Sequence, residues 1–264
     1  MIKSIGTMVV LLYAAIVFSG CATTTGFPPA PDMGRDALRV GVTPDSPPLI
    51  FRLDGNIVGA EADLALRLGA TLHRPVEFVA LRWDDLIPAL MAEKIDIIMS
   101  GMTITEVRKA VINFSHFYLK SGLATLMRAE DAYRFNSVKS ILGSEATVGV
   151  MAGTTSETFV RGNFPNALLV IPFRNPSDVV YSLKTTRIDL FVYDAASIVW
   201  FVSENEGILT GFWEFLNVEY LGWGVRRGDD AFLKQVNSVL TTWRQDGTLR
   251  QILGKWLPHW KSFD

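Results

Sequence analysis

The sequence contains few of the residues that build cross-links and metal sites. Only one cysteine, Cys21, occurs among 264 residues, so no disulfide can form within the chain. The three histidines, His73, His116 and His259, are far apart and lack the spacing of metal ligands. We therefore expect neither a metal site nor any other cofactor.

An excess of charge of one sign is also missing. Lysine and arginine number 25 against 27 aspartate and glutamate residues, which gives a formal net charge of -2 at pH 7. This balance argues against a nucleic-acid partner, because such proteins carry basic patches. Hydrophobic residues make up 49% of the chain, enough for one large core or two smaller ones.

A long apolar run is absent after the N-terminus, and the run at the N-terminus is short. Lys3 is the only charge before the apolar segment 8–18, whose roughly 11 residues are too few for a membrane span of ~20. This pattern predicts a signal peptide over residues 1–20. No later segment is apolar enough to cross a bilayer.

The signal segment ends in Phe18-Ser19-Gly20-Cys21, which resembles the bacterial lipobox, although Phe18 replaces the usual leucine. In a lipobox the cysteine is acylated and becomes the new N-terminus, so we predict lipidation of Cys21. The alternative is an ordinary secretory signal with an incidental cysteine. Residues 21–36, rich in Thr, Pro and Gly, are typical of a flexible tether. We therefore expect the chain to be lipid-anchored in the cell envelope, on the periplasmic or extracytoplasmic face.

Short apolar runs alternate with helical patterns from residue 38 onward, which predicts an α/β fold. We expect one set of strands at 38–42, 76–79 and 95–99, with helices at 62–72 and from Asp84 or Asp85 to about 93. A second set has strands at 147–151, 168–171 and 188–193, with helices opening at 153–157 and spanning 177–184. A further helix is expected at about 230–245, and a last helix follows it and ends near 256. Two such sets imply two Rossmann-like lobes.

Polar residues follow the strand that is expected to end at Met99. Ligands bind at this end of the strands in open α/β sheets. Gly101 allows close backbone approach, and the Thr103 hydroxyl can bond a carboxylate oxygen. Thr105 is a candidate N-cap, which places Arg108 in the first helical turn. A cation there faces the positive end of the helix dipole, which costs ~0.3–1 kcal/mol. A bound anion would offset this cost. The alternative is a surface arginine paired with Glu106 or with solvent.

The second set of strands carries a complementary group. Gly153, Thr154 and Thr155 offer backbone N–H groups and hydroxyls at a helix start. Asp194 follows the strand ending at Tyr193, where it could instead act as a helix N-cap. A guanidinium on one lobe and a carboxylate on the other match the two ends of a zwitterion.

These residues resemble the bacterial extracellular solute-binding proteins of family 3, the polar amino acid transport class. The resemblance covers nearly all of the chain after the tether. It is carried by Arg39-Val-Gly41, Val58-Gly59 with Asp63-Leu64, Trp83 to Leu90, Met102 to Thr105 with Arg108, Phe114-Ser115 with Tyr118, Val148-Gly-Val150 with Gly153 to Thr155, Ile188-Asp189 through Asp194, Gly224-Val225, and Trp243 to Thr248.

The resemblance implies a type II periplasmic-binding-protein fold, with two lobes joined by crossover strands near 120–123 and 220–222. We expect lobe 1 to comprise 38–121 plus 222–264, and lobe 2 to comprise 122–221. It implies that Arg108 binds an α-carboxylate, Asp194 binds the α-ammonium, and Trp83 covers the ligand's side chain. It also implies that Gly101, Thr103 and Thr155 contact the same two ligand groups. We call these residues, together with Arg108 and Asp194, the clamp, and we add the adjacent Ser100 and Thr154. The expected partners are a free amino acid and ABC transporter membrane subunits, and we expect a monomer.

The expected side-chain subsite is formed by Thr43, Ser46, Trp83 and Met151, with Tyr193 as a further candidate. Family members often have an aromatic residue in place of Ser46, and many that take basic or amide side chains have aspartate in place of Thr43. The subsite residues carry no formal charge, which favours an uncharged side chain. Asp45 and Glu157 are close in sequence and leave a charged one open.

Two other functions remain open. Cyclohexadienyl or arogenate dehydratases are similar in sequence and share the fold, but they need a general acid. The turn after Asp194 reads Ala195-Ala196-Ser197 and has no carboxylate, whereas Glu157 is a conceivable acid. A ligand-sensing envelope lipoprotein or an adhesin is the other alternative. We expect a binding protein and assign no catalytic residue.

Overall fold

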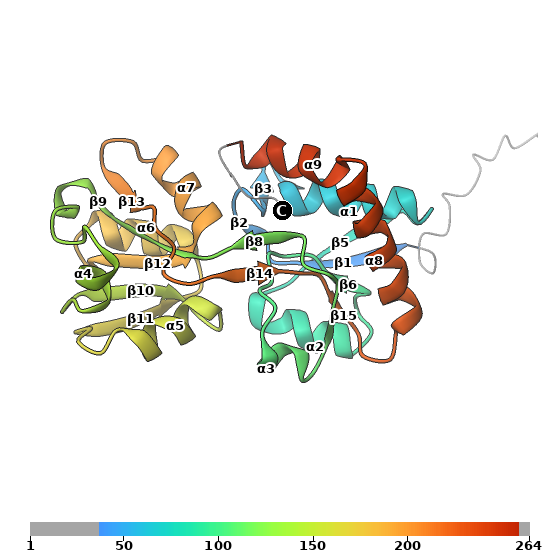
Figure 1. The fold of residues 1–264 in the computed structure, drawn as a ribbon, viewed down its shortest axis with the longest axis horizontal. Coiled ribbons are helices and arrows are strands. Elements are labelled where there is room, and N and C mark those ends of the chain that lie inside the picture. The colour runs from blue at the N-terminus through green and yellow to red at the C-terminus, as the bar shows by residue number, and fades with distance from the viewer. Residues whose placement is uncertain (1–36, 259–264) are drawn as a thin grey trace, which may run out of the picture. The chain divides into compact units, whose positions relative to one another are not determined.

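The computed structural model describes residues 37–258, all within a unit that spans Gly34–Asp264. The predicted signal peptide, Cys21, the predicted tether and His259 lie outside the described residues. Two five-stranded sheets organise the described part, and a short two-stranded ladder links them (Figure 1).

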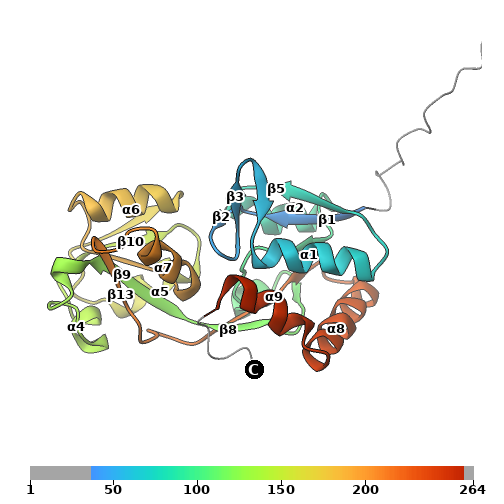
Figure 2. The same cartoon turned by 90° about the horizontal axis from the view of Figure 1, so that it is seen from above.

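The first sheet has the strand order β5-β1-β6-β15-β7. Its parallel strands are β1 (Leu38–Val42), β5 (Val76–Ala80) and β6 (Ile97–Ile98), and β15 (Gly224–Val225) runs antiparallel to both β6 and β7 (Asn113–Phe114). Helices α1 (Ala60–Thr71), α8 (Asp230–Gln245) and α9 (Thr248–Trp256) cover one face, and α2 (Leu86–Met91) covers the other (Figure 2). The apolar residues of α1 recur on one side, with Leu64, Ala65 and Leu68 fully buried against this sheet.

A small antiparallel sheet lies at the edge of the first lobe. It consists of β2 (Asp45–Ser46), β3 (Ile50–Leu53) and β4 (Asn56–Val58). The sequence analysis did not predict it, because a two-residue strand gives no alternating pattern to detect. It positions Asp45 and Ser46 for the site.

The second sheet has the strand order β11-β10-β12-β9-β13. Strands β10 (Thr147–Met151), β11 (Leu169–Phe173) and β12 (Leu190–Asp194) are parallel, while β9 (Leu123–Arg128) and β13 (Leu209–Phe212) are antiparallel to their neighbours. Because side chains alternate along a strand, β12 serves two cores. Its Leu190 and Val192 pack with α4 (Val138–Leu142) and α5 (Thr155–Asn163), whereas Phe191 and Tyr193 pack with α6 (Pro176–Lys184) and α7 (Ala195–Ser203).

The ladder between the sheets pairs β8 (Leu119–Ser121) with β14 (Glu219–Leu221). One residue separates β8 from β9, and two separate β14 from β15, so each ladder strand carries the chain from one lobe to the other. The predicted fold class, two α/β lobes joined by two hinge strands, is thereby confirmed.

Several predicted elements differ from the structure. The strand expected at 95–99 is only the two residues of β6, because Ile95 packs in the core beneath α2 instead. A short 3₁₀ turn, η1 (Trp83–Asp85), precedes α2, and the carboxylates of Asp84 and Asp85 pair with arginines rather than capping it. The remaining short elements are α3 (Glu106–Lys109) and η2 (Ala129–Asp131).

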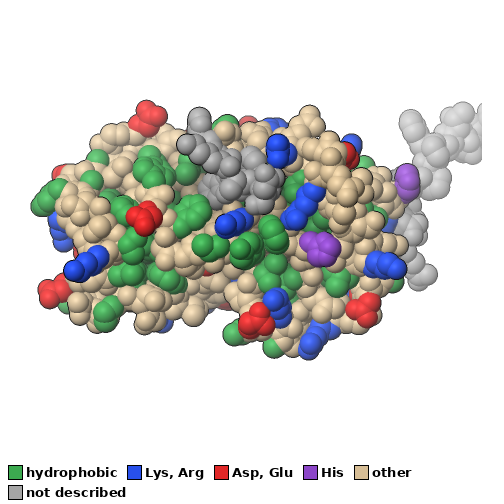
Figure 3. Space-filling model, viewed as in Figure 1, with side chains coloured by type: hydrophobic (Ala, Val, Ile, Leu, Met, Phe, Trp, Pro, Cys, Tyr) green, Lys and Arg blue, Asp and Glu red, His purple; other side chains and the backbone are tan. Residues whose placement is uncertain are grey.

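The distribution of surface charge and the apolar character of the helices match what the composition of the sequence predicts. On the face shown in Figure 3, basic and acidic side chains are interspersed, and no area of one sign dominates. Among residues 37–258, none of the helices combines the length and the apolar character that a membrane crossing requires.

Candidate ligand-binding site

Nine of the eleven residues expected to bind ligand line one small cavity of about 10 Å³. They are Ser46, Trp83, Ser100, Gly101, Thr103, Arg108, Thr154, Thr155 and Asp194. The other two, Thr43 and Met151, line an adjoining cavity of about 430 Å³. The sheets and hinge therefore bring together side chains from both lobes that are as many as 148 positions apart in the sequence, as Ser46 and Asp194 are.

Arg108 enters the small cavity from α3. The Thr105 hydroxyl accepts a hydrogen bond from Arg108 N at 3.2 Å, which confirms Thr105 as the N-cap. The Arg108 guanidinium donates to the carbonyl oxygen of Thr103 at 2.8 Å and lies 5.1 Å from the centre of the Trp83 ring. Glu106 pairs with Lys109 instead, so the alternative of a surface Arg108–Glu106 pair is wrong. Burial lowers the pKa of Arg108, while the charges of Asp194 and Glu219 oppose this shift.

Asp194 enters the same cavity from the end of β12. It occupies the N-cap position of α7, yet its side chain makes no capping hydrogen bond, so the carboxylate remains available. Burial and the charge of Glu219 raise the pKa of Asp194 to about 8, against the opposing effect of Arg108. The charged carboxylate is therefore disfavoured until a cation arrives.

Gly101 is held in place by a buried acid that the sequence analysis did not single out. Glu61, fully buried at the start of α1, accepts hydrogen bonds from Gly101 N at 2.7 Å, the Tyr118 hydroxyl at 2.6 Å and Trp223 Nε1 at 2.9 Å. Burial raises the pKa of Glu61 to about 7, and the three hydrogen bonds oppose this shift. Tyr118 and Trp223 flank the two hinge strands, so one carboxylate connects the hinge to the backbone of the site.

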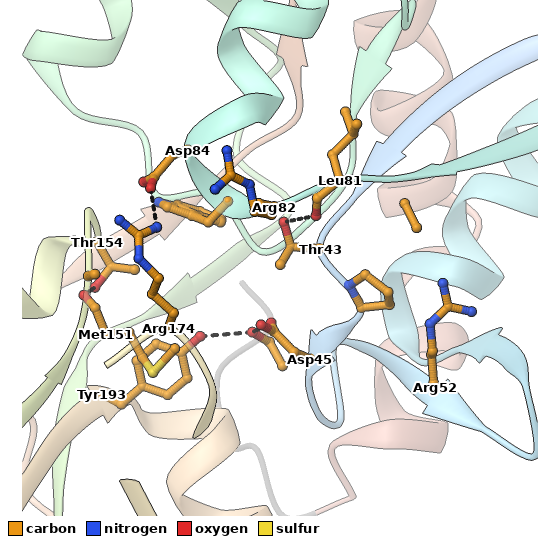
Figure 4. Close-up of a pocket in the computed structure, with 15 residues that line it drawn as sticks. Thr43, Asp45, Arg52, Leu81, Arg82, Asp84, Met151, Thr154, Arg174 and Tyr193 are labelled. Atoms are coloured by element: carbon orange, nitrogen blue, oxygen red, sulfur yellow. Dashed lines mark hydrogen bonds and ion pairs between the residues drawn. The ribbon is translucent and has the colours of Figure 1, made fainter. Parts of the chain in front are cut away.

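Trp83 and Gly153 connect the lobes across the cleft. The indole Nε1 donates to the Gly153 carbonyl oxygen at 3.0 Å. Gly153 has a φ of 72°, and a Cβ there would lie 2.7 Å from Asp84 Oδ1, so a larger residue would clash. Asp84 itself pairs with Arg174 of the other lobe at 2.6 Å (Figure 4).

The larger cavity is the expected side-chain compartment (Figure 4). The Thr43 hydroxyl donates to the Leu81 carbonyl at 3.1 Å, and the hydroxyls of Ser46 and Tyr193 are 2.8 Å apart. The compartment also carries charge that the expected set did not include, from Asp45, Arg52, Arg82, Asp84 and Arg174. Burial raises the pKa of Asp45 to about 6, and its carboxylate accepts a hydrogen bond from Ser46 at 3.2 Å.

Two predicted polar groups are engaged within their own lobe. The Thr154 hydroxyl donates to the Met151 carbonyl at 2.7 Å. Glu157 accepts a hydrogen bond from Gly153 N at 2.9 Å and pairs with Arg161, and these contacts lower its pKa. A carboxyl that ionises readily is a poor proton donor, so Glu157 does not suit the role of general acid.

Glu219 is a further site residue that the sequence analysis missed. It begins the hinge strand β14 and is buried, with 5% of its surface exposed. One carboxylate oxygen accepts hydrogen bonds from the Thr103 hydroxyl at 2.7 Å and the Thr155 hydroxyl at 3.2 Å. Its position beside the crossover expected at 220–222 was the only available signal, because its partners are 116 and 64 residues away.

Residues 38–259 match the model of a known family, the bacterial extracellular solute-binding proteins, family 3. The chain belongs to this family. It is 27% identical over 223 residues to the L-cystine-binding protein TcyJ of Escherichia coli K12, covering 84% of this chain and 83% of the relative.

Two solved structures extend the comparison of this solute-binding protein. A binding component of an ABC transporter from Wolinella succinogenes, complexed with lysine, has a TM-score of 0.80 and 30% identity, over 84% of this chain and 96% of that one. The ancestral amino acid-binding protein AncCDT-1, a precursor of cyclohexadienyl dehydratase, has a TM-score of 0.78 and 34% identity, over 85% and 96% of the two chains.

Proposed function

We propose that this solute-binding protein captures a free amino acid between its lobes and delivers it to the membrane subunits of an ABC importer. One observation carries the proposal. A guanidinium from lobe 1 and a carboxylate from lobe 2, Arg108 and Asp194, line the same small cavity, and neither has a salt-bridge partner among the described residues. A zwitterion supplies both missing charges at once.

In this proposal Arg108 binds the α-carboxylate and Asp194 binds the α-ammonium. Ser100, Gly101, Thr103, Thr154 and Thr155 form the remaining walls of the head-group cavity. This cavity has room for no more than about one water, so the ligand enters by separation of the lobes. The ligand's side chain extends past Trp83 into the cavity of about 430 Å³, beside Thr43, Ser46, Met151 and Tyr193.

The named relatives support this assignment. TcyJ is named for cystine, the Wolinella structure contains lysine, and AncCDT-1 is described as amino acid-binding. Their ligands differ from one another, so the relatives support the class of ligand and leave its side chain to direct measurement.

A thermal-shift screen with the twenty proteinogenic L-amino acids tests the proposal. A ligand at 100 times its dissociation constant stabilises the folded protein by about 2.7 kcal/mol, which raises the melting temperature by several degrees. We expect at least one amino acid to do so. No shift with any amino acid, each at 10 mM, would contradict the proposal.

A second function, dehydration of a cyclohexadienyl acid, is favoured by one observation. The raised pKa of Asp194 suits a general acid, and AncCDT-1 is described as a precursor of such an enzyme. Incubation of the protein with prephenate and with arogenate separates the two functions. Formation of phenylpyruvate or phenylalanine above the uncatalysed rate would establish catalysis, and unchanged substrate is expected from a binding protein.

We further propose that a lipid on Cys21 anchors the protein to the extracytoplasmic face of the membrane. The support is the sequence alone, because Cys21 lies outside the described residues. In cells, the wild-type protein should sediment with membranes and gain the mass of an acylated N-terminal cysteine. The Cys21→Ala variant should appear in the soluble fraction, and equal membrane association of both would contradict the anchor.

A further inference from the structure

The hydroxyl groups of Thr103 and Thr155 already have an acceptor in the protein. Both donate to the same carboxylate oxygen, Oε2 of Glu219, at 2.7 and 3.2 Å. A hydroxyl has one proton to donate, and a carboxylate can only accept. While these bonds exist, neither threonine has a proton left for the carboxylate of a ligand.

Glu219 is fixed by contacts on its other side. Its Oε1 accepts a hydrogen bond from Asn217 Nδ2 at 3.0 Å, and the Asn217 side-chain oxygen accepts from Leu123 N at 2.8 Å. Leu123 begins β9, directly after the hinge strand β8, so this chain of bonds spans both hinge strands. With 5% of its surface exposed, the carboxylate has little access to solvent that could replace these donors.

The two threonines come from different lobes. Thr103 follows β6 and makes a β-bridge to Leu221 on the hinge, whereas Thr155 is the first residue of α5 in the second lobe. Thr103 from the first lobe and Thr155 from the second thus both donate to a carboxylate on the hinge strand β14. The Thr155–Glu219 bond is one of the two that join the lobes at the hinge. It resembles the bond that a ligand carboxylate would make, but the protein supplies it.

We propose that Glu219 is a positioning residue of the cleft, which takes the hydroxyl protons of Thr103 and Thr155 and joins the closed lobes behind the clamp. The ligand's carboxylate is then held by Arg108 and backbone N–H groups rather than by the two threonine hydroxyls. This inference rests on the proposed function insofar as the ligand carries a carboxylate.

A double-mutant cycle tests it. The probe is the proteinogenic L-amino acid that gives the largest thermal shift with the wild-type protein, and its affinity is measured by calorimetry. Thr155→Val should weaken binding about three- to tenfold in the wild type and less than twofold when combined with Glu219→Leu, which leaves no acceptor for the hydroxyl. An equal loss in both backgrounds would show that the hydroxyl bonds the ligand directly, and would overturn the proposal.

The matched control is Glu157→Leu, the same chemical change on α5 at a carboxylate whose hydrogen bonds and ion pair with described residues stay within its own lobe. In that background Thr155→Val should weaken binding as much as in the wild type. A pH profile gives a second readout, because the charge of Glu219 raises the pKa of Asp194. Glu219→Gln removes this charge and should therefore lower the pH at which the affinity levels off. A purely structural role would not produce this change.

The free protein distinguishes this inference from the proposed function. If no amino acid binds, the proposed function fails, but the Thr155–Glu219 contact can still be measured by urea denaturation. Thr155→Val and Glu219→Leu together should then destabilise the protein less than the sum of their separate effects. Additive effects would overturn the inference whatever the ligand is.

Discussion

The indole Nε1 of Trp83 donates a 3.0 Å hydrogen bond to the carbonyl oxygen of Gly153, which joins the lobes directly beside the clamp. Gly153 has a φ of 72°, which glycine adopts without strain. The Ser46–Tyr193 and Asp84–Arg174 contacts also cross the cleft. Contacts between protein groups therefore hold the two lobes together, and a ligand would add further contacts.

Trp83→Phe removes this hydrogen bond while keeping an aromatic ring over the cavity. A net hydrogen bond contributes about 0.5–1.5 kcal/mol, so affinity for the amino acid found in the thermal-shift screen should fall about two- to tenfold. Stopped-flow fluorescence should place the loss in faster dissociation. The control is Trp213→Phe, because Trp213 is 56% exposed outside both cavities. Equal effects of the two substitutions would contradict this account of closure.

Asp194 should make binding depend on pH. Its pKa is raised to about 8, so at pH 7 most molecules carry a proton that the ligand's ammonium must displace. Affinity should therefore rise up to about tenfold per unit between pH 6 and pH 8 and then level off. Calorimetry at pH 7 in two buffers of different ionisation enthalpy should show nearly one proton released per ligand bound. No proton release would contradict this role for Asp194.

Asp45 should lower stability at neutral pH. Its folded pKa of about 6 lies above the usual value of 3.8, so the folded state binds the proton more tightly. The corresponding stability is present below about pH 4 and is lost as the pH rises through 6. Asp45→Asn should thus raise the free energy of unfolding by about 1–3 kcal/mol at pH 7 and hardly at all at pH 4.

Urea denaturation at the two pH values measures this difference. Asp54→Asn is the control, because Asp54 is exposed at the turn between β3 and β4 of the same small sheet and its φ of 50° suits asparagine. The control should change stability little at either pH. A gain for Asp45→Asn that is as large at pH 4 as at pH 7 would contradict the raised pKa.

The sequence predicted the parts of the fold that are governed by local pattern. The helices at 230–245 and 177–184 and the strands at 38–42 and 147–151 have periodic apolar residues, and the structure has elements at those places. Arg108 and Asp194 were predictable because each follows a strand at the end where α/β sheets bind ligands. The family resemblance added the way the two lobes face each other.

What escaped prediction depends on distant neighbours. Glu61 and Glu219 are single acids without a local motif, and all but one of the donors described for them are 40 to 162 residues away in the chain. Asp45 faces the cavity because β2 pairs with β3, and a strand of two residues has no readable period. Arg82 and Asp84 are next to Trp83 in the sequence, but only the fold shows that they line this compartment together with Arg174.

Calorimetric titration of the wild type and of Arg108→Ala, with the amino acid that gives the largest thermal shift, tests the central claim most directly. Loss of one partner of a charge-assisted pair costs about 2–5 kcal/mol, so the variant should bind at least about 30-fold more weakly. Circular dichroism should show that the variant remains folded, because within residues 37–258 the Arg108 side chain donates a single hydrogen bond, to the Thr103 carbonyl. A folded variant that binds the amino acid as tightly as the wild type would contradict the Arg108–Asp194 clamp.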